Sequence, residues 1–253
     1  MAVITPTNQS VLAFKGLHLY HSAISNCAMR VRMALEEKRL PWESHALDLK
    51  KGETHTPEYF GINPNGVVPT LVHDGVVIIE SDDILEYLDD KFPDPPLRPP
   101  GPVQRAEVHY WLKLATGIHL PGVKPWIYYN RMRNALKMQG EALESYRRLQ
   151  TNPELLAFHE KSASADGFSE QDINTSGQIL RDAWQRVEAS LQRHDWIAGA
   201  EFSLADIAWV PLHFTLVGAN FDFEPYPAVR AWEARLHQRD CFQQGILKWC
   251  PKF

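Results

Sequence analysis

The sequence predicts two domains, an α/β domain followed by an all-α domain. Residues 17–92 alternate between strand-like and helix-like patterns in the order β-α-β-β-α. Six prolines then fall within residues 93–102, where they remove backbone donors and hold the chain extended. Beyond them, apolar residues recur at helical spacing. We therefore expect an α/β domain at 16–92, a proline-rich linker at 93–104 and a helical domain at 105–253.

The composition is that of a globular protein whose partners are small molecules or proteins. The chain has 253 residues, 44% of them hydrophobic, and its formal charge of -5 is spread along the sequence. This charge offers no basic surface for nucleic acid or anionic lipid. We expect a cytoplasmic protein, because no segment resembles a secretion signal or a membrane span. The three scattered cysteines indicate neither a disulfide framework nor a zinc site, so we expect no metal.

The first domain is expected to combine a β-α-β unit with a hairpin. Residues 17–21 have the pattern of a strand, 25–38 of a helix and 42–49 of a second strand, which predicts a parallel pair. The runs PTLV and VVII then flank Asp74 and Gly75. This dipeptide favours a two-residue hairpin turn because both positions tolerate positive φ, so these runs are expected to form an antiparallel pair.

Helix start and stop signals divide the rest of the chain. Ser81 is the expected cap of the last helix of the first domain, since a serine there can accept a hydrogen bond from a main-chain N–H. In the second domain LPGVKP, residues 120–125, is expected to interrupt the first helical stretch, and a long helix is expected from about residue 126 to residue 148. Ser203 and Asp206 have the spacing of a capping box, which predicts a buried helix after them.

Ser25 and Cys27 are the first candidates for chemistry. With Ser25 as the helix cap, the amide groups that follow it point toward the end of the preceding strand, where they stabilise an anion such as a thiolate. Taken alone, the two residues fit a plain cap and a packed helix cysteine better, because most cysteines of this kind are inert.

Two further stretches favour a ligand that contains an amino acid. In NPNGVVPTL, a cis bond before Pro69 would turn the main chain of Val68 outward, free to pair with an extended peptide. Glu80 and Ser81, at the start of the next helix, could hold an amino group and a carboxylate. These are the two charged ends of an amino-acid moiety.

Five features in this order resemble the glutathione S-transferase superfamily: SNCAMRVRMALEEKRLPWE, NPNGVVPTL, IES, the proline-rich linker and WIAGAEFSLADI. The resemblance covers residues 17–245 and is of the theta- and zeta-like serine type. It implies a thioredoxin-like domain that binds glutathione as a cosubstrate, a helical domain that binds a hydrophobic electrophile, and a homodimer. It requires no metal, because the nucleophile is the sulfur of glutathione.

The resemblance also implies which residues hold glutathione. Val68 would pair with the cysteinyl backbone, Pro69 would be the cis proline, and Glu80 with Ser81 would hold the γ-glutamyl end. The glycyl carboxylate would lie at the loop LKKGETHTPEYF. The full set implied at glutathione is Lys51 (or Lys50), His55, Val68, Pro69, Glu80 and Ser81.

Val67 is a departure from the family's pattern, since it stands where the family often has a lysine. One contact to the glycyl carboxylate is therefore missing or replaced.

The resemblance favours Ser25 over Cys27 as the activating residue. Ser25 stands six residues before Val31, like the serine that donates a hydrogen bond to the glutathione sulfur in theta- and zeta-like members. Such a bond lowers the pKa of the thiol and keeps the nucleophile ionised. SNCAM also resembles the Ser-x-Cys-Ser-Met segment of bacterial tetrachlorohydroquinone dehalogenases, with Ala28 in place of the second serine. There the cysteine attacks a glutathionyl intermediate, so Cys27 is the alternative.

The electrophile pocket is expected among aromatic residues of the second domain, because aromatic walls suit flat apolar substrates. The candidates are Trp111, Trp126, Tyr128, Tyr129, Trp209 and His213. The length of residues 121–170 is similar to that of the bacterial enzymes that cleave β-aryl ethers of lignin with glutathione.

Three functions follow from these features. The main hypothesis is a glutathione-dependent transferase that acts on a hydrophobic, aromatic electrophile of the aryl halide or aryl ether type, with roles in detoxification or aromatic degradation. One alternative is a reductive dehalogenase or thiol reductase that uses Cys27. The other is a binding or scaffold protein that kept the fold without catalysis.

Overall fold

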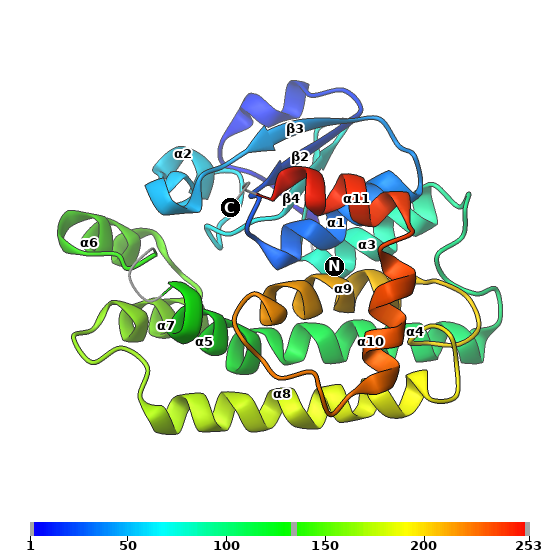
Figure 1. Cartoon of the computed structure of the whole chain (residues 1–253). Coiled ribbons are helices and arrows are strands. Elements are labelled where there is room, and N and C mark those ends of the chain that lie inside the picture. The colour runs from blue at the N-terminus through cyan, green and yellow to red at the C-terminus, as the bar shows by residue number, and fades with distance from the viewer. Residues whose placement is uncertain (1–2, 133–135, 251–253) are drawn as a thin grey trace.

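The computed structural model describes residues 3–132 and 136–250, and it consists of an α/β domain followed by an all-α domain (Figure 1). This confirms the predicted fold class. The strands are β1 (Val3–Ile4), β2 (Leu17–His21), β3 (Trp42–Ala46), β4 (Thr70–His73) and β5 (Val76–Ile79). The helices are α1 (Asn26–Glu37), α2 (Pro57–Phe60), α3 (Ser81–Lys91), α4 (Pro102–Gly117), α5 (Lys124–Ile127), α6 (Gly140–Leu149), α7 (Pro153–Ala163), α8 (Glu170–Leu191), α9 (Leu204–Val217), α10 (Pro227–Leu236) and α11 (Asp240–Gly245).

The strands form one sheet in the order β1-β5-β4-β2-β3. β2 and β3 are parallel and are joined through α1, while β4 and β5 form the expected antiparallel hairpin. Its turn residues Asp74 and Gly75 have φ values of 49° and 81°, as the Asp-Gly signal predicts. β1 pairs with β5, so the first domain begins before the expected residue 16. A two-residue strand shows no alternation that the sequence could reveal.

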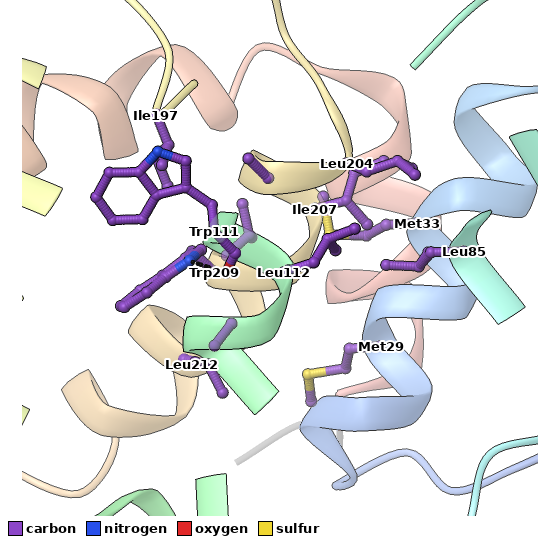
Figure 2. Close-up of a cluster of buried hydrophobic side chains, with 14 of the residues drawn as sticks. Met29, Met33, Leu85, Trp111, Leu112, Ile197, Leu204, Ile207, Trp209 and Leu212 are labelled. Carbon is purple, nitrogen blue, oxygen red and sulfur yellow. Dashed lines mark hydrogen bonds between the residues drawn. The ribbon is translucent and has the colours of Figure 1, made fainter. Parts of the chain in front are cut away.

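The larger of two hydrophobic clusters runs from α1 into the helical domain. α1 packs against α3 on its own domain and against α9 and α11 of the other. Figure 2 shows the side chains of α1 and α3 meeting those of α4 and α9. The labelled residues there are Met29, Met33, Leu85, Trp111, Leu112, Ile197, Leu204, Ile207, Trp209 and Leu212. Because this apolar surface is shared, the two domains hold a defined relative position.

Two buried arginines of α1 reinforce this packing. Arg30 is 1% exposed and donates from Nε to the carbonyl of Ala208 at 3.0 Å, and from Nη2 to the carbonyl of Ala115 at 3.3 Å. Arg32 is fully buried and donates from Nε to the carbonyl of Gly245 at 2.7 Å. A buried guanidinium is tolerated only where its N–H groups find acceptors. Both arginines find them in the helical domain.

The end of the chain returns to the first domain, where α11 lies beside α1 (Figure 1). Trp249 packs edge-on against His21 of β2, with ring centroids 4.6 Å apart, and the guanidinium of Arg32 lies 5.5 Å from the Trp249 ring. The helical domain therefore closes over one end of the sheet.

Two predicted helix boundaries are wrong. Glu80, not Ser81, is the N-cap of α3, and it has a φ of 65°. The segment 120–125 does not break the helix either, because a π-helical turn at His119–Val123 joins α4 to α5. A local π turn absorbs the glycine and proline signals without ending the helix.

The long helix expected over 126–148 is also wrong. A π-helical turn follows at Tyr128–Met132, residues 133–135 lie outside the described residues, and α6 begins only at Gly140. Gly140 has a φ of 54°, which favours a break there.

The predicted capping box at Ser203 and Asp206 is present and has further partners. The Asp206 carboxylate is fully buried and accepts hydrogen bonds from the main-chain N–H of Ser203 and of Ile197, both at 3.0 Å, and from the indole of Trp232 at 2.9 Å. A second capping box, Ser169 with Asp172, starts α8 on the surface. The two boxes share their local geometry and differ in burial.

We expect Asp206→Ala to remove the cap bond from the Ser203 N–H and to lower the free energy of unfolding by about a further 2–6 kcal/mol, because it also leaves the buried N–H groups of Ile197 and Trp232 without acceptors at about 1–3 kcal/mol each. Urea denaturation measures this loss. Asp172→Ala is the matched control and should cost about 1 kcal/mol, the usual value of an exposed cap. Equal losses of unfolding free energy in the two variants would show that the buried hydrogen bonds of Asp206 add no stability beyond that of the cap.

No helix in the described part of the chain has the length and apolar content needed to cross a membrane.

Candidate functional site

A cavity of about 1110 Å³ lies between the two domains. The first domain lines it with the start of α1, the loop before α2, the loop before β4 and the start of α3. The helical domain lines it with the π-helical turns around α5 and with parts of α6, α7 and α9. Residues far apart in sequence therefore face one space.

Ser25 is the N-cap of α1, as predicted, and it lines the cavity. Its Oγ accepts a hydrogen bond from the main-chain N–H of Ala28 at 3.3 Å. The hydroxyl proton of Ser25 thus stays available to an acceptor in the cavity. The N-terminus of α1 adds its positive end of the helix dipole at the same place.

Cys27 also lines the cavity, and its Sγ lies 3.7 Å from Nε2 of His119. The same Nε2 lies 2.8 Å from the carbonyl Oδ1 of Asn26. Burial, and then the charges of Lys124 and Arg30, hold the pKa of His119 well below its usual value, so the imidazole is neutral and Nε2 carries the proton that Asn26 accepts. His119 Nε2 therefore carries a proton, donates it to Asn26 and does not act as a base toward Cys27.

The loop before β4 contains the cis Val68–Pro69 bond that the sequence predicts. Asn63 and Tyr59 fix the position of this loop, because the side chain of each donates a hydrogen bond to the carbonyl of Val67 at 2.8 Å. Among the described residues, none forms a hydrogen bond with the main chain of Val68, which lines the cavity. This leaves a backbone donor and acceptor for an extended ligand.

Glu80 and Ser81 stand at the junction of β5 and α3 and both line the cavity. Asn65 donates to Oε1 of Glu80 at 3.1 Å, and the positive φ of Glu80 marks a strained conformation of the kind found at functional sites. Arg30 donates to Oγ of Ser81 at 3.2 Å. Because that oxygen already accepts a bond, the Ser81 hydroxyl is free to donate to an anion.

The two basic residues expected near the glycyl carboxylate lie at the cavity but differ in environment. The Lys51 side chain is 73% exposed and lies 3.9 Å from Asp48. His55 is partly buried against Tyr146 of α6, with ring centroids 4.8 Å apart. Burial, and then the charge of Lys124, lowers the pKa of His55 to about 4. At neutral pH His55 can offer a hydrogen bond but no charge.

Lys124, the first residue of α5, brings a cation to the cavity wall. Its Nζ lies 4.9 Å from the centre of the Phe158 ring, and no described residue forms a hydrogen bond or ion pair with this Nζ. Burial lowers its pKa, and the nearby Cys27 opposes that shift. Burial, and then the charge of Lys124, lower the pKa of His159 to about 2. This wall would gain from an anionic group on a ligand.

Apolar side chains from both domains complete the cavity. They are Ile24, Met29, Leu120, Ile127, Tyr128, Met132, Leu136, Met138, Leu155 and Phe214.

Of the aromatic residues expected in the electrophile pocket, only Tyr128 lies on the described cavity wall. Trp111 and Trp209 pack against each other in the core, with ring centroids 5.9 Å apart. Trp126 donates to the carbonyl of Ala219 at 3.1 Å.

The two remaining candidates also lie elsewhere. His213 is buried against Phe223, and Tyr129 lines a smaller hollow of about 140 Å³ with Phe168. The pocket prediction is therefore wrong for five of its six residues. Aromatic side chains in amphipathic helices mostly face the core, and the sequence does not show which one faces a cavity.

Several cavity residues were not predicted, among them His119, Lys124 and His159. Lys124 and His119 lie next to LPGV, a segment that reads as a helix break. A lysine within an otherwise apolar stretch is the signal that could have indicated Lys124.

Comparisons with known proteins agree with this geometry. Residues 19–96 match the family described as "Glutathione S-transferase, N-terminal domain", and residues 151–240 match "Glutathione S-transferase, C-terminal domain". "Glutathione S-transferase Z2" of Arabidopsis thaliana is 31% identical over 93% of this chain and 92% of its own. The chain belongs to the glutathione S-transferase family. "Glutathione S-transferase 1" of Dianthus caryophyllus is 30% identical over 85% of this chain and 84% of its own.

Among solved structures, the beta-etherase LigF from Sphingobium sp. strain SYK-6 superimposes with a TM-score of 0.79. It is 27% identical and the match covers 92% of this chain and 99% of that one. The protein is thus an enzyme of the glutathione S-transferase family, with a thioredoxin-like first domain and a helical second domain. The family binds glutathione.

We expect Lys124→Met to raise the pKa of His55 above about 4, because removing a nearby positive charge stabilises the imidazolium. An NMR titration of the histidine ring protons from neutral pH downward measures it. Lys137→Met is the control, since Lys137 also lines the cavity but donates to the carbonyl of Ser164. An unchanged His55 titration would show that burial alone depresses this pKa.

Proposed function

We propose that this protein is a glutathione-dependent transferase that acts on a hydrophobic, aromatic electrophile of the aryl halide or aryl ether type. One observation carries the proposal. Ser25, the cis Val68–Pro69 bond and the Glu80–Ser81 pair, which come from three separate loops, all face the cavity that the helical domain closes.

The residues present suit the shape and charges of glutathione. The carboxylate of Glu80 would accept a hydrogen bond from the α-ammonium group of the γ-glutamyl end. The Ser81 hydroxyl would donate a hydrogen bond to its α-carboxylate. The unpaired main chain of Val68 would bind the cysteinyl backbone. His55 and Lys51 would meet the glycyl carboxylate from the loop before α2, where Val67 adds no charge.

This placement brings the sulfur of the bound tripeptide to Ser25. Bound glutathione supplies a thiolate nucleophile. The Ser25 hydroxyl donates a hydrogen bond to that sulfur, and the N-terminus of α1 adds a favourable field. Together they keep the thiol ionised near neutral pH, and the two domains hold the nucleophile and the electrophile in one cavity.

The wall provided by the helical domain favours a substrate that is apolar and has, or develops, negative charge. Tyr128, Phe214 and several methionines supply apolar surface. Lys124 supplies a cation near Cys27 and therefore near the sulfur. In displacement of a halide or a phenolate, Lys124 would stabilise the charge that grows on the leaving group. The beta-etherase LigF, named for its action on an ether, is similar over nearly the whole chain.

A reductive reaction is the second candidate, because the thiol of Cys27 lines the same cavity two residues after Ser25. In this reaction the Cys27 thiolate would attack the sulfur of a glutathione conjugate and form a mixed disulfide with glutathione. The carbon–sulfur bond would break, and the carbon would leave with the electron pair and take up a proton to give the reduced product. A second glutathione thiolate would then attack the glutathione sulfur of the mixed disulfide, which releases glutathione disulfide and restores the Cys27 thiolate. The N–H of His119, which is donated to Asn26, lies 3.7 Å from Cys27 Sγ and would be shared with the Cys27 thiolate.

Homodimerisation stays a prediction. Val103 and Tyr110, which are 77% and 43% exposed on α4, stand seven residues apart and offer one apolar face for it.

We expect Ser25→Ala to raise the apparent pKa of the bound glutathione thiol toward that of free glutathione, and to lower turnover about tenfold or more, because it removes a hydrogen bond to a charged sulfur. Ultraviolet absorbance of the thiolate during a pH titration measures the pKa. Ser145→Ala, a change at another serine on the cavity wall, should leave the titration unchanged.

A thiolate that titrates alike in wild type and Ser25→Ala would remove Ser25 from the mechanism. No thiolate in any variant, even with glutathione bound, would favour the scaffold function over catalysis.

For the reductive candidate, we expect Cys27→Ser to stop turnover after the conjugate forms, since serine cannot form the mixed disulfide. Mass spectrometry of the quenched reaction detects the accumulated conjugate. Cys250→Ser, at the other thiol on the cavity wall, is the matched control. Full reductive turnover in Cys27→Ser would exclude this reaction.

A further inference from the structure

A second cluster of chemically active side chains lies on the sheet, apart from the described lining of the cavity. It consists of His18 on β2 with Glu43 and His45 on the edge strand β3. His18 is paired in register with Glu43, and Tyr20 with His45. Since residues paired in register, and residues two apart on a strand, share a face, all three ligand-type side chains project from the same side of the sheet.

The distances within the cluster are those of a metal site. His18 Nδ1 lies 3.0 Å from His45 Nε2 and 3.6 Å from Glu43 Oε2. His45 Nε2 lies 3.8 Å from Glu43 Oε1. Ligand atoms at the usual zinc distances around a tetrahedral ion stand about 3.4 Å apart. The three groups, whose ligand atoms lie within 4.8 Å of one another, could therefore bind one ion after a small rotation of the exposed Glu43 side chain.

The protonation of His18 is already suited to a ligand. Its Nε2 lies 2.9 Å from the carbonyl oxygen of Lys15. A carbonyl only accepts, so Nε2 carries the proton and the lone pair of the neutral imidazole sits on Nδ1, the atom that faces His45 and Glu43. An outer N–H bonded to a backbone carbonyl is the arrangement that orients metal-binding histidines.

Aromatic rings and strands hold the two imidazoles in place. Phe14 stacks on His18 with ring centroids 4.2 Å apart, and Tyr20 stacks on His45 at 4.6 Å. His18 is 7% exposed, whereas the Glu43 side chain is 66% exposed. The site is thus rigid at its base and open to solvent at the carboxylate, so an ion can enter and keep a water ligand.

We infer that His18, Glu43 and His45 form a binding site for a divalent transition-metal ion of the zinc type, with water completing the coordination. Two imidazoles and one carboxylate are ligands that Zn²⁺ accepts, and its lack of geometric preference suits a site built across two strands. Binding converts His45 from the tautomer that donates to His18 into the one that carries its proton on Nδ1. The ion would tie the edge strand β3 to β2.

The experiment titrates tag-free, metal-stripped full-length protein with Zn²⁺ by calorimetry and by competition with a chromogenic chelator. We expect one ion per chain, and binding weakened at least about tenfold in His45→Ala and in Glu43→Gln. His109→Ala is the matched control, because His109 forms a pair with Glu86 at 3.1 Å on the helices but belongs to no cluster with a second histidine among the described residues. Cys27→Ser controls for the thiol and imidazole in the cavity. Both controls should bind like the wild type.

Thermal unfolding gives a second readout, since an ion that binds only the folded state raises Tm. Zn²⁺ should raise the Tm of the wild type and of His109→Ala but not that of His45→Ala. The inference is overturned if His45→Ala binds with wild-type affinity, if Cys27→Ser alone abolishes binding, or if the wild type binds no ion at about 100 μM Zn²⁺. None of these outcomes depends on activity toward glutathione.

Discussion

The burial of α1 between the two domains is the constraint on which the rest of the structure depends. Its apolar side chains meet both the sheet and the helices α9 and α11. Arg30 lies inside this contact with hydrogen bonds to the carbonyls of Ala208 and Ala115 and to Ser81. A guanidinium without these acceptors would cost several kcal/mol to bury. The two domains therefore meet in one arrangement, and α1 sets it.

The cavity is a consequence of this arrangement. Since α1 runs through the interface, its N-terminus lies at the cavity between the domains. Ser25 and Cys27 line the cavity at this point. Arg30 links the interface to the ligand site, because it donates a hydrogen bond to Oγ of Ser81. The Ser81 hydroxyl can then donate its own proton to a ligand. Positioning the nucleophile and joining the domains are thus done by one helix.

Charge is distributed unevenly around this cavity, in a way that suits its proposed ligand. Glu80 offers negative charge at one end, whereas Lys124 brings positive charge to a wall where burial and that charge keep the neighbouring histidines neutral. A separate histidine cluster lies at the β3 edge of the sheet, where His18 stacks on Phe14 and His45 stacks on Tyr20. The two clusters have no residue in common among the described residues.

Short sequence signals determined many turns and helix ends of this protein. The Asp74–Gly75 turn, the Ser25 cap, the cis bond before Pro69 and the Ser203 capping box all depend on residues a few positions apart, and each is present. Their order was enough to indicate the family. The start of β1 and the π-helical turn at His119–Val123 were missed, because one is too short to show a period and the other keeps the helix while shifting its phase.

Only the tertiary structure decided which helix faces line the cavity. It buried Trp111 and Trp209 in the core, brought Lys124 and His119 to the wall beside Cys27, and set His18 beside His45 across two strands. These contacts join residues tens of positions apart. Their geometry comes from packing between elements, and the amphipathic pattern of a single helix or strand carries no information about the partner it will meet.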